Sequence, residues 1–165
     1  MGELTIRSAR VEDVPAITDI YNDAVLNTTA TFDTEPLSVE NRIAWFKNRT
    51  KDFPVIVAAE AGRVVAYAAL NRWSDRKAYD ISAELSLYVE AEHRGRLIGK
   101  RLYVHILELA LSTGLYTIIL RITADNDVSL GLARRAGFQD VGVLRRCGTK
   151  FDRVLDVVLL QKILK

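Results

Sequence analysis

The chain has 165 residues, of which 49% are hydrophobic and 27% are charged, and its formal net charge is +2. This composition predicts one globular domain over residues 1–165 and excludes a general nucleic-acid binder, which carries a large positive excess. No apolar run approaches the roughly 20 residues of a membrane span, and the charged N-terminal segment lacks the apolar core of a signal peptide. Because Cys147 is the single cysteine, no internal disulfide is expected, which favours a cytoplasmic location.

The first half of the chain alternates between strand and helix patterns. Residues 11–27 carry apolar side chains at helical spacing, with Glu12 and Asp13 where a helix N-terminus favours negative charge. Ser38 is a suitable N-cap for a second helix, and the Ala61–Gly62 turn separates two apolar runs, as in a β-hairpin. The predicted order is a strand, a helix, a loop, a helix and two hairpin strands, over residues 3–9, 11–27, 28–36, 38–50, 54–60 and 63–70.

The second half begins with a polar loop at residues 71–79 and then returns to strand and helix patterns. Its strands are predicted over residues 80–90, 116–123, 138–146 and 153–164, and its helices over residues 94–114 and 126–137. This order predicts a mixed α/β fold. We expect the ligand-binding part in the strand–helix–strand unit from Asp80 to Thr123.

The segment His93–Tyr103, HRGRLIGKRLY, concentrates positive charge and glycine ahead of a helix. A Walker A loop is excluded because Gly95 and Gly99 enclose three residues instead of four, and Arg101 stands where Ser or Thr binds magnesium. The dinucleotide fingerprint G-x-G-x-x-G is also absent. Two interpretations remain: an ordinary surface turn, or a loop whose backbone N–H groups and helix dipole hold a pyrophosphate.

The same segment resembles the coenzyme A loop of the GNAT family of acetyl-CoA-dependent N-acetyltransferases, which reads Q/R-x-x-G-x-G/A after a strand. Arg94 and Gly99 match the ends of that motif. Leu97 stands at its middle glycine, and because a Cβ disfavours positive φ, this departure argues against tight backbone contact there. The segment NDVSLGLARRAGF resembles the family's N-x-x-S…GF motif, which implies that Asn126 contacts the pantetheine end of the cofactor.

Four further segments resemble the phosphinothricin and methionine sulfoximine acetyltransferase branch of this family: IYNDAVLNTTATFDTEP, NRIAWF, AELSLYV and GTKFDRVLD. The match runs from Ile6 to Leu164. It implies a mixed, mostly antiparallel sheet of about seven strands flanked by about four helices, acetyl-CoA as acetyl donor, no metal, and a homodimer. The implied cofactor-binding residues are Leu87, Tyr88, Val89, Arg94, Gly95, Arg96, Leu97, Ile98, Gly99, Lys100, Asn126 and Ser129.

Acetylation of an amine needs a neutral amine, a stabilised carbonyl oxygen and a thiolate that can leave. Alternation within residues 80–90 gives one face of the strand made of Ser82, Glu84, Ser86 and Tyr88. Glutamate is disfavoured in the middle of a strand, so Glu84 is either a salt-bridged or edge-strand glutamate or, as the resemblance implies, the general base. Exposed backbone N–H groups of the same strand would polarise the thioester.

The resemblance also implies a substrate pocket beside Glu84, covered by the polar loop before the strand. Arg76 in that loop could pair with a substrate carboxylate or phosphinate, or could be a solvated arginine. Phe32 lines the pocket or anchors its own loop, and Lys150 approaches from a neighbouring subunit or is a lysine at a hairpin tip. The implied substrate-binding residues are Phe32, Ser74, Asp75, Arg76, Glu84, Leu85, Ser86 and Lys150.

One feature of the family is missing from the sequence. Many members carry a Tyr or His four residues beyond the serine that corresponds to Ser129, where it can protonate the departing sulfur. Here that position is Ala133, so we expect turnover without a general acid from this helix. His93 and His105 each have a glutamate three residues away, but three or four convergent metal ligands are absent from the pattern.

The sequence therefore predicts an acetyl-CoA-dependent N-acetyltransferase that acts on the α-amine of a small amino-acid analogue. Phosphinothricin, methionine sulfoximine and methionine sulfone are the expected acceptors, and Glu84 is the expected general base for direct attack on the thioester. Two alternatives stay open: an acetyltransferase of protein N-termini or another small amine, and a non-catalytic acyl-CoA-binding module.

Overall fold

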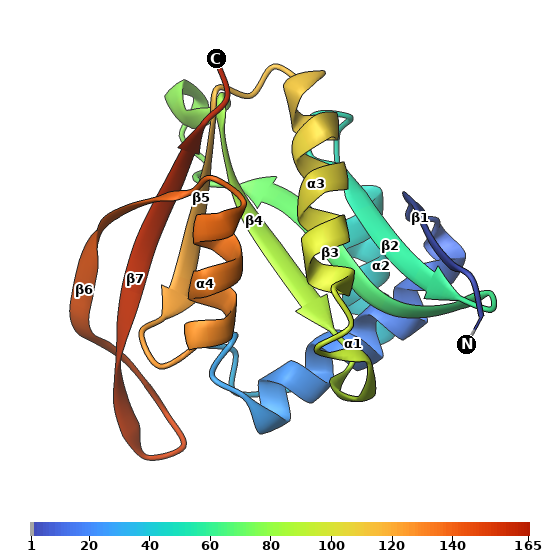
Figure 1. Cartoon of the computed structure of the whole chain (residues 1–165), viewed down its shortest axis with the longest axis horizontal. Coiled ribbons are helices and arrows are strands. Elements are labelled where there is room, and N and C mark those ends of the chain that lie inside the picture. The colour runs from blue at the N-terminus through green and yellow to red at the C-terminus, as the bar shows by residue number, and fades with distance from the viewer. Residues whose placement is uncertain (1) are drawn as a thin grey trace.

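Seven strands form one sheet in this computed structural model, which describes residues 2–165 (Figure 1). The sheet has the order β1-β2-β3-β4-β5-β7-β6, and neighbouring strands are antiparallel except β4 and β5, which are parallel. The strands are β1 (Leu4–Ser8), β2 (Val55–Glu60), β3 (Arg63–Arg72), β4 (Ser82–Val89), β5 (Thr117–Thr123), β6 (Gln139–Lys150) and β7 (Arg153–Ile163). The α-helices of the described residues are α1 (Val14–Asn27), α2 (Val39–Lys47), α3 (Ile98–Leu111) and α4 (Asp127–Arg135). The expected mixed, mostly antiparallel sheet with four helices is confirmed.

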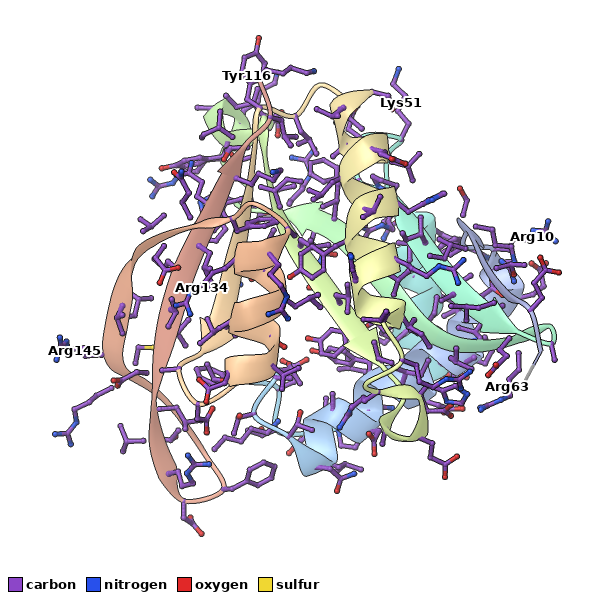
Figure 2. The ribbon with its side chains drawn as sticks, viewed as in Figure 1. Arg10, Lys51, Arg63, Tyr116, Arg134 and Arg145 are labelled. Atoms are coloured by element: carbon purple, nitrogen blue, oxygen red, sulfur yellow. The ribbon has the colours of Figure 1, made fainter. Side chains whose placement is uncertain are left out.

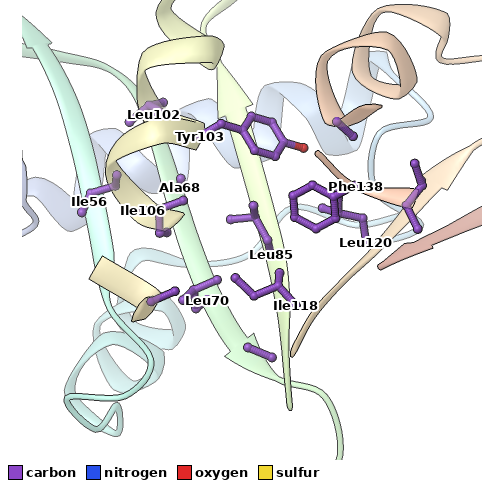
Figure 3. Packing of buried hydrophobic residues seen from close by; sticks show 14 of the residues in the cluster. Ile56, Ala68, Leu70, Leu85, Leu102, Tyr103, Ile106, Ile118, Leu120 and Phe138 are labelled. Carbon is purple, nitrogen blue, oxygen red and sulfur yellow. The ribbon is translucent and has the colours of Figure 1, made fainter. Parts of the chain in front are cut away.

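The helices cover the two faces of the sheet in pairs. On one face, Ile17 of α1 packs in a cluster with Tyr67, and the aromatic side of α2 adds to it. On the other face, Leu102 and Ile106 of α3 pack over Leu85 of β4 (Figure 3). Strands β2 and β3 contribute to both clusters, which explains why they read as continuous apolar runs. Within residues 2–165, no helix is both long and apolar enough to cross a bilayer.

Two predicted boundaries differ from the structure by four residues. The helix expected to start at residue 94 starts at Ile98, because the residues before it form the basic loop. The strand expected to end at residue 146 continues as β6 to Lys150, past an irregularity in its pairing with β7 after Leu144. A bulge interrupts the alternation of inward and outward side chains, so sequence periodicity cannot follow a strand through it.

The parallel pair at the centre of the sheet is short. Strands β4 and β5 pair only from Ser82↔Thr117 to Glu84↔Ile119, although both strands continue for several residues beyond. Figure 1 shows them together near the C-terminal end of the chain and then separating. The gap thus opens beyond the carboxyl ends of a parallel pair joined by α3, the side on which α/β sheets bind ligands.

Candidate active site

A cleft of about 480 Å³ opens where β4 and β5 separate. Both strands supply consecutive residues to its walls, and the segment after α1 closes one side. Of the residues predicted from the sequence, the cleft is lined by Phe32, Glu84, Leu85, Ser86, Leu87, Tyr88, Asn126 and Ser129. The structure therefore brings the predicted base, part of the predicted substrate pocket and part of the predicted cofactor site into one cleft.

The backbone of β4 has hydrogen-bonding groups that face this cleft. Glu90 N–H donates to the carbonyl of Val65 at 2.9 Å, so alternate residues of β4 pair with β3. The residues in between face β5. The N–H of Leu85 still belongs to the last pair, Glu84↔Ile119, whereas the N–H and C=O groups of Leu87 lie where β5 has already separated. These are exposed strand groups of the kind that can bind an amide-containing chain or a developing oxyanion.

Glu84 is joined to Arg121 of β5 across the gap. The Nε and Nη2 atoms of Arg121 donate to the two carboxylate oxygens at 2.7 and 2.6 Å. The Glu84 side chain is 18% exposed and that of Arg121 is 55% exposed, so the pair sits at the mouth of the cleft. Hydrogen bonding to Glu84 raises the pKa of Arg121. Sequence analysis missed Arg121, although a lone arginine inside the apolar strand at residues 116–123 was a usable signal.

The basic loop before α3 has a backbone that is open to a ligand. Leu97 is the N-cap residue and adopts φ 61° and ψ 9°, and Gly95 has φ 76°. The expectation that leucine would avoid positive φ here is therefore wrong: the chain takes the left-handed turn without glycine. Its side chain points into solvent with 69% exposed, and a Cβ on Gly95 would meet nothing within 4 Å.

The charged and small residues of this loop have partners of their own. Arg94 donates from Nε to the carbonyl of Val89 at 3.1 Å, while Arg96 donates to the carboxylate of Glu60 at 2.6 and 3.1 Å. The Arg96 hydrogen bond holds the pKa of Glu60 below its usual value. A Cβ on Gly99 would lie 2.9 Å from Cδ2 of Leu132, so this glycine also permits close packing of α3 against α4. Ile98 is buried, and Lys100 is exposed on the first turn.

Asn126 is the N-cap of α4. Its Oδ1 accepts a hydrogen bond from the backbone N–H of Ser129 at 3.1 Å, and both residues line the cleft. Ala133, where relatives were expected to carry an acid, is fully buried and lies outside the cleft lining. A phenol does reach the cleft from α3, namely Tyr103, and burial raises its pKa, so it is protonated at neutral pH.

The remaining predicted substrate residues do not line the cleft. Asp75 and Arg76 are exposed in the loop before β4, where Ser74 Oγ accepts from the backbone N–H of Arg76 at 3.2 Å. Lys150 is 4% exposed, and its Nζ donates to the carbonyl of Thr31 in the same chain at 2.8 Å. Burial lowers the pKa of Lys150. In this structure Lys150 thus supports the segment that carries Phe32 into the cleft wall.

Comparison with known proteins identifies the family. Residues 6–159 match the family model described as Acetyltransferase (GNAT) domain. The chain is 39% identical over 159 residues to the L-methionine sulfoximine/L-methionine sulfone acetyltransferase of Pseudomonas aeruginosa, covering 95% of this chain and 92% of that protein. It is 34% identical over 165 residues to the phosphinothricin N-acetyltransferase of Streptomyces coelicolor, covering 98% and 96% of the two chains.

A solved structure agrees with this assignment. The phosphinothricin acetyltransferase from Sinorhizobium meliloti, in complex with AcCoA, matches with a TM-score of 0.93 and 32% identity. The match covers 98% of this chain and 88% of that chain. The family model, the relatives and the solved structure thus agree, and the chain belongs to the GNAT acetyltransferase family.

Proposed function

We propose that this acetyltransferase transfers the acetyl group of acetyl-CoA to the α-amine of a small amino-acid analogue of the phosphinothricin, methionine sulfoximine or methionine sulfone type. The observation that carries the proposal is the cleft between β4 and β5, in which a carboxylate, Glu84, lies beside unpaired backbone groups. The names of the relatives supply the acceptor class.

Acetyl-CoA fits the residues that are present. The left-handed turn at Leu97 and the open space over Gly95 leave backbone N–H groups at the start of α3 free to approach a pyrophosphate. Arg94 and Lys100 add positive charge, and Leu87 and Asn126 line the path toward Glu84. When bound, acetyl-CoA supplies an activated acetyl thioester.

Glu84 would act as base for the acceptor amine, directly or through water. A free α-amine has a pKa of about 7.7–8.0, so only a modest base is needed near neutral pH. Both Glu84 oxygens accept from Arg121, but each oxygen keeps a second lone pair for an amine or a water. The backbone N–H of Leu87 would face the oxyanion that develops on the thioester carbonyl. Ser74, Asp75 and Arg76 would close over the acceptor from their exposed loop.

The proposal is tested by measuring thiol release from acetyl-CoA in the presence of an acceptor panel: phosphinothricin, methionine sulfoximine, methionine sulfone, natural amino acids and an N-terminal peptide. We expect release that depends on one of the first three amines. Release with the peptide alone would assign the enzyme to protein N-termini. Saturable binding of acetyl-CoA without release for any amine would indicate a binding module and overturn the proposal.

A homodimer is part of the same proposal. Strand β6 is one edge of the sheet, and Figure 2 shows Arg145 projecting outward from it. Apolar side chains are exposed on β6, on β7 and at the turn between them, namely Val141, Val143, Leu144, Phe151 and Val154. An uncovered apolar edge strand favours association, so this surface supports pairing with a second subunit.

The cytoplasm is the proposed location.

A further inference from the structure

A second cavity of about 200 Å³ lies beside the cleft, on the face of the sheet covered by α1 and α2. Its walls are Tyr21, Arg42, Trp45, Tyr67, Ala69, Asn71, Ser86 and Tyr88. Three of these residues, Tyr21, Ser86 and Tyr88, also line the cleft. The two spaces are therefore neighbours that share a wall on the Glu84 side of β4.

Arg42 is a buried cation without a counter-charge in this cavity. It is 7% exposed, and its buried Nε has no hydrogen-bond partner in residues 2–165. Its guanidinium lies 3.8 Å from the ring centroid of Trp45, and Nη2 is 3.5 Å from the hydroxyl oxygen of Tyr67. No carboxylate of the described chain pairs with it. Burying an unpaired charge and an unsatisfied donor is costly, which makes this guanidinium a candidate for ligand binding.

Arg49 lies against the same Trp45 ring as Arg42, but its guanidinium is hydrogen-bonded to groups of the fold. Its guanidinium lies 4.5 Å from the Trp45 centroid, and it donates to the carbonyl of Phe53 at 2.9 Å, to Oδ1 of Asn71 at 3.1 Å and to the carbonyl of Leu70. Burial lowers its pKa to about 10. Two cations therefore lie against Trp45 with neutral partners only, and their combined field favours an anion or a strong acceptor in the cavity.

The walls of the cavity run along the paired strands from Glu84 toward Arg42. In the register of β3 and β4, Asn71 lies opposite Glu84, and Tyr67 lies opposite Tyr88. At about 3.3 Å per residue, Tyr88 is roughly 13 Å along the strand from Glu84.

We propose that this cavity is the subsite for the oxygen-bearing distal group of the acceptor, a phosphinate, sulfone or sulfoximine, which Arg42 and Tyr67 hold. The proposal rests on the function proposed above. These groups share oxygens on a tetrahedral centre, and the Nε–Nη edge of a guanidinium can donate to such oxygens in a fork. The Tyr67 hydroxyl accepts from Arg42 and has no acceptor for its own hydrogen in the described residues, so that hydrogen is available too.

The position of the cavity favours the distal group over the α-carboxylate. The carboxylate carbon of an amino acid is two bonds from the amine that Glu84 would serve, whereas the phosphorus or sulfur is four bonds away. The longer arm extends further from Glu84 along β4, toward the end of the cavity where Arg42 and Tyr67 lie. Selection of an oxygen-bearing acceptor then comes from buried donors, which are left unsatisfied when a thioether or alkyl group enters.

The test compares methionine sulfone with methionine, which has the same chain length but no oxygen on sulfur. The kcat/KM ratio of the two acceptors is measured for the wild type, Arg42→Lys and Arg49→Lys. We expect Arg42→Lys to lower the sulfone-to-methionine ratio roughly ten- to hundred-fold, the range for a lost charge-assisted hydrogen bond. The matched Arg49→Lys change should leave the ratio unaltered, because its donors serve the fold. A partly unfolded variant loses the same fraction of kcat/KM with both acceptors, so the ratio does not change for that reason.

An unchanged ratio in Arg42→Lys, with the wild type active, would overturn the subsite and leave the proposed function standing. If the wild type acetylates neither acceptor, the function fails, and a binding measurement decides the subsite. In a Trp73→Phe chain, Trp45 is the remaining tryptophan and lies against Arg42. Phosphinothricin without acetyl-CoA should then change the emission of Trp45 saturably, and a flat titration would refute the subsite.

Discussion

Glu84 is held in place by Arg121 and still has capacity to accept a proton, since each oxygen makes one hydrogen bond to the guanidinium. We predict that Glu84→Gln lowers kcat by about 10²–10⁴-fold near neutral pH, the usual contribution of a general base. The loss should shrink as pH rises, because the amine then deprotonates unaided. The affinity for acetyl-CoA should be unchanged, because the loop at residues 94–100 lies beyond the far end of β4. A loss that is the same at every pH would show that Glu84 only positions the acceptor.

Leu97 carries backbone strain that a glycine would relieve. A left-handed conformation costs an L-residue about 1–2 kcal/mol, partly offset by the extra freedom that glycine has when unfolded. We predict that Leu97→Gly raises the free energy of unfolding by up to about 1 kcal/mol in urea titrations. Leu97→Ala is the control, since alanine keeps the Cβ and should bring no such gain. Equal effects of the two changes would mean that the positive φ is not the source.

Asp13 joins three parts of the N-terminal region: strand β1, the turn after it and the start of α1. Its carboxylate accepts from Nη1 and Nη2 of Arg7 at 2.7 and 2.8 Å and from the backbone N–H of Arg10 at 2.7 Å. The hydrogen bonds from Arg7 hold the pKa of Asp13 below its usual value, although burial opposes the shift. The stabilisation is therefore complete above the unfolded-state pKa of about 3.9 and is lost as pH falls through the lower folded-state pKa.

We predict that Asp13→Asn lowers the free energy of unfolding by about 1.5–3 kcal/mol at pH 7, the range for hydrogen bonds to a charged group. The difference from the wild type should diminish progressively as pH falls below about 4, because the unfolded carboxyl is protonated there and the folded one follows at its lower pKa. Denaturant titrations at pH 7 and at pH 3 measure it. A difference that is equally large at both pH values would show that the carboxylate charge is not what joins β1 to α1.

Strand β6 is an edge strand with exposed apolar side chains. A second subunit that covers these side chains would make the protein a dimer. We predict that the wild type sediments as a dimer and that Val143→Lys, which places a charge on β6 where the side chain is 50% exposed, sediments as a monomer. Val128→Lys is the matched control, because Val128 is 80% exposed on α4 instead of β6, and it should remain dimeric. A monomeric wild type, or a dimeric Val143→Lys, would contradict this surface as the interface.

Local patterns in the sequence were enough to predict the helices, the strands and part of the site. Alternation in residues 80–90 placed Glu84, Ser86 and Tyr88 on one face of a strand, and all three line the cleft. The elements follow because helix and strand periodicities depend on neighbours within a few residues. The family motifs also singled out the segment before α3 and Asn126, since each motif is contiguous, and the structure shows Asn126 as the N-cap of α4.

Contacts between distant segments were decided by the tertiary structure alone. Arg121 meets Glu84 only because β4 and β5 separate after three residue pairs, and Lys150 reaches Thr31 across 119 positions. Whether Arg42 has a counter-charge depends on which side chains close around it, and no spacing in the sequence encodes that. The sequence by itself thus determined the elements, the family motifs and the candidate base, while packing decided which charges are paired and which remain available to a ligand, because burial and pairing are properties of side chains from separate elements.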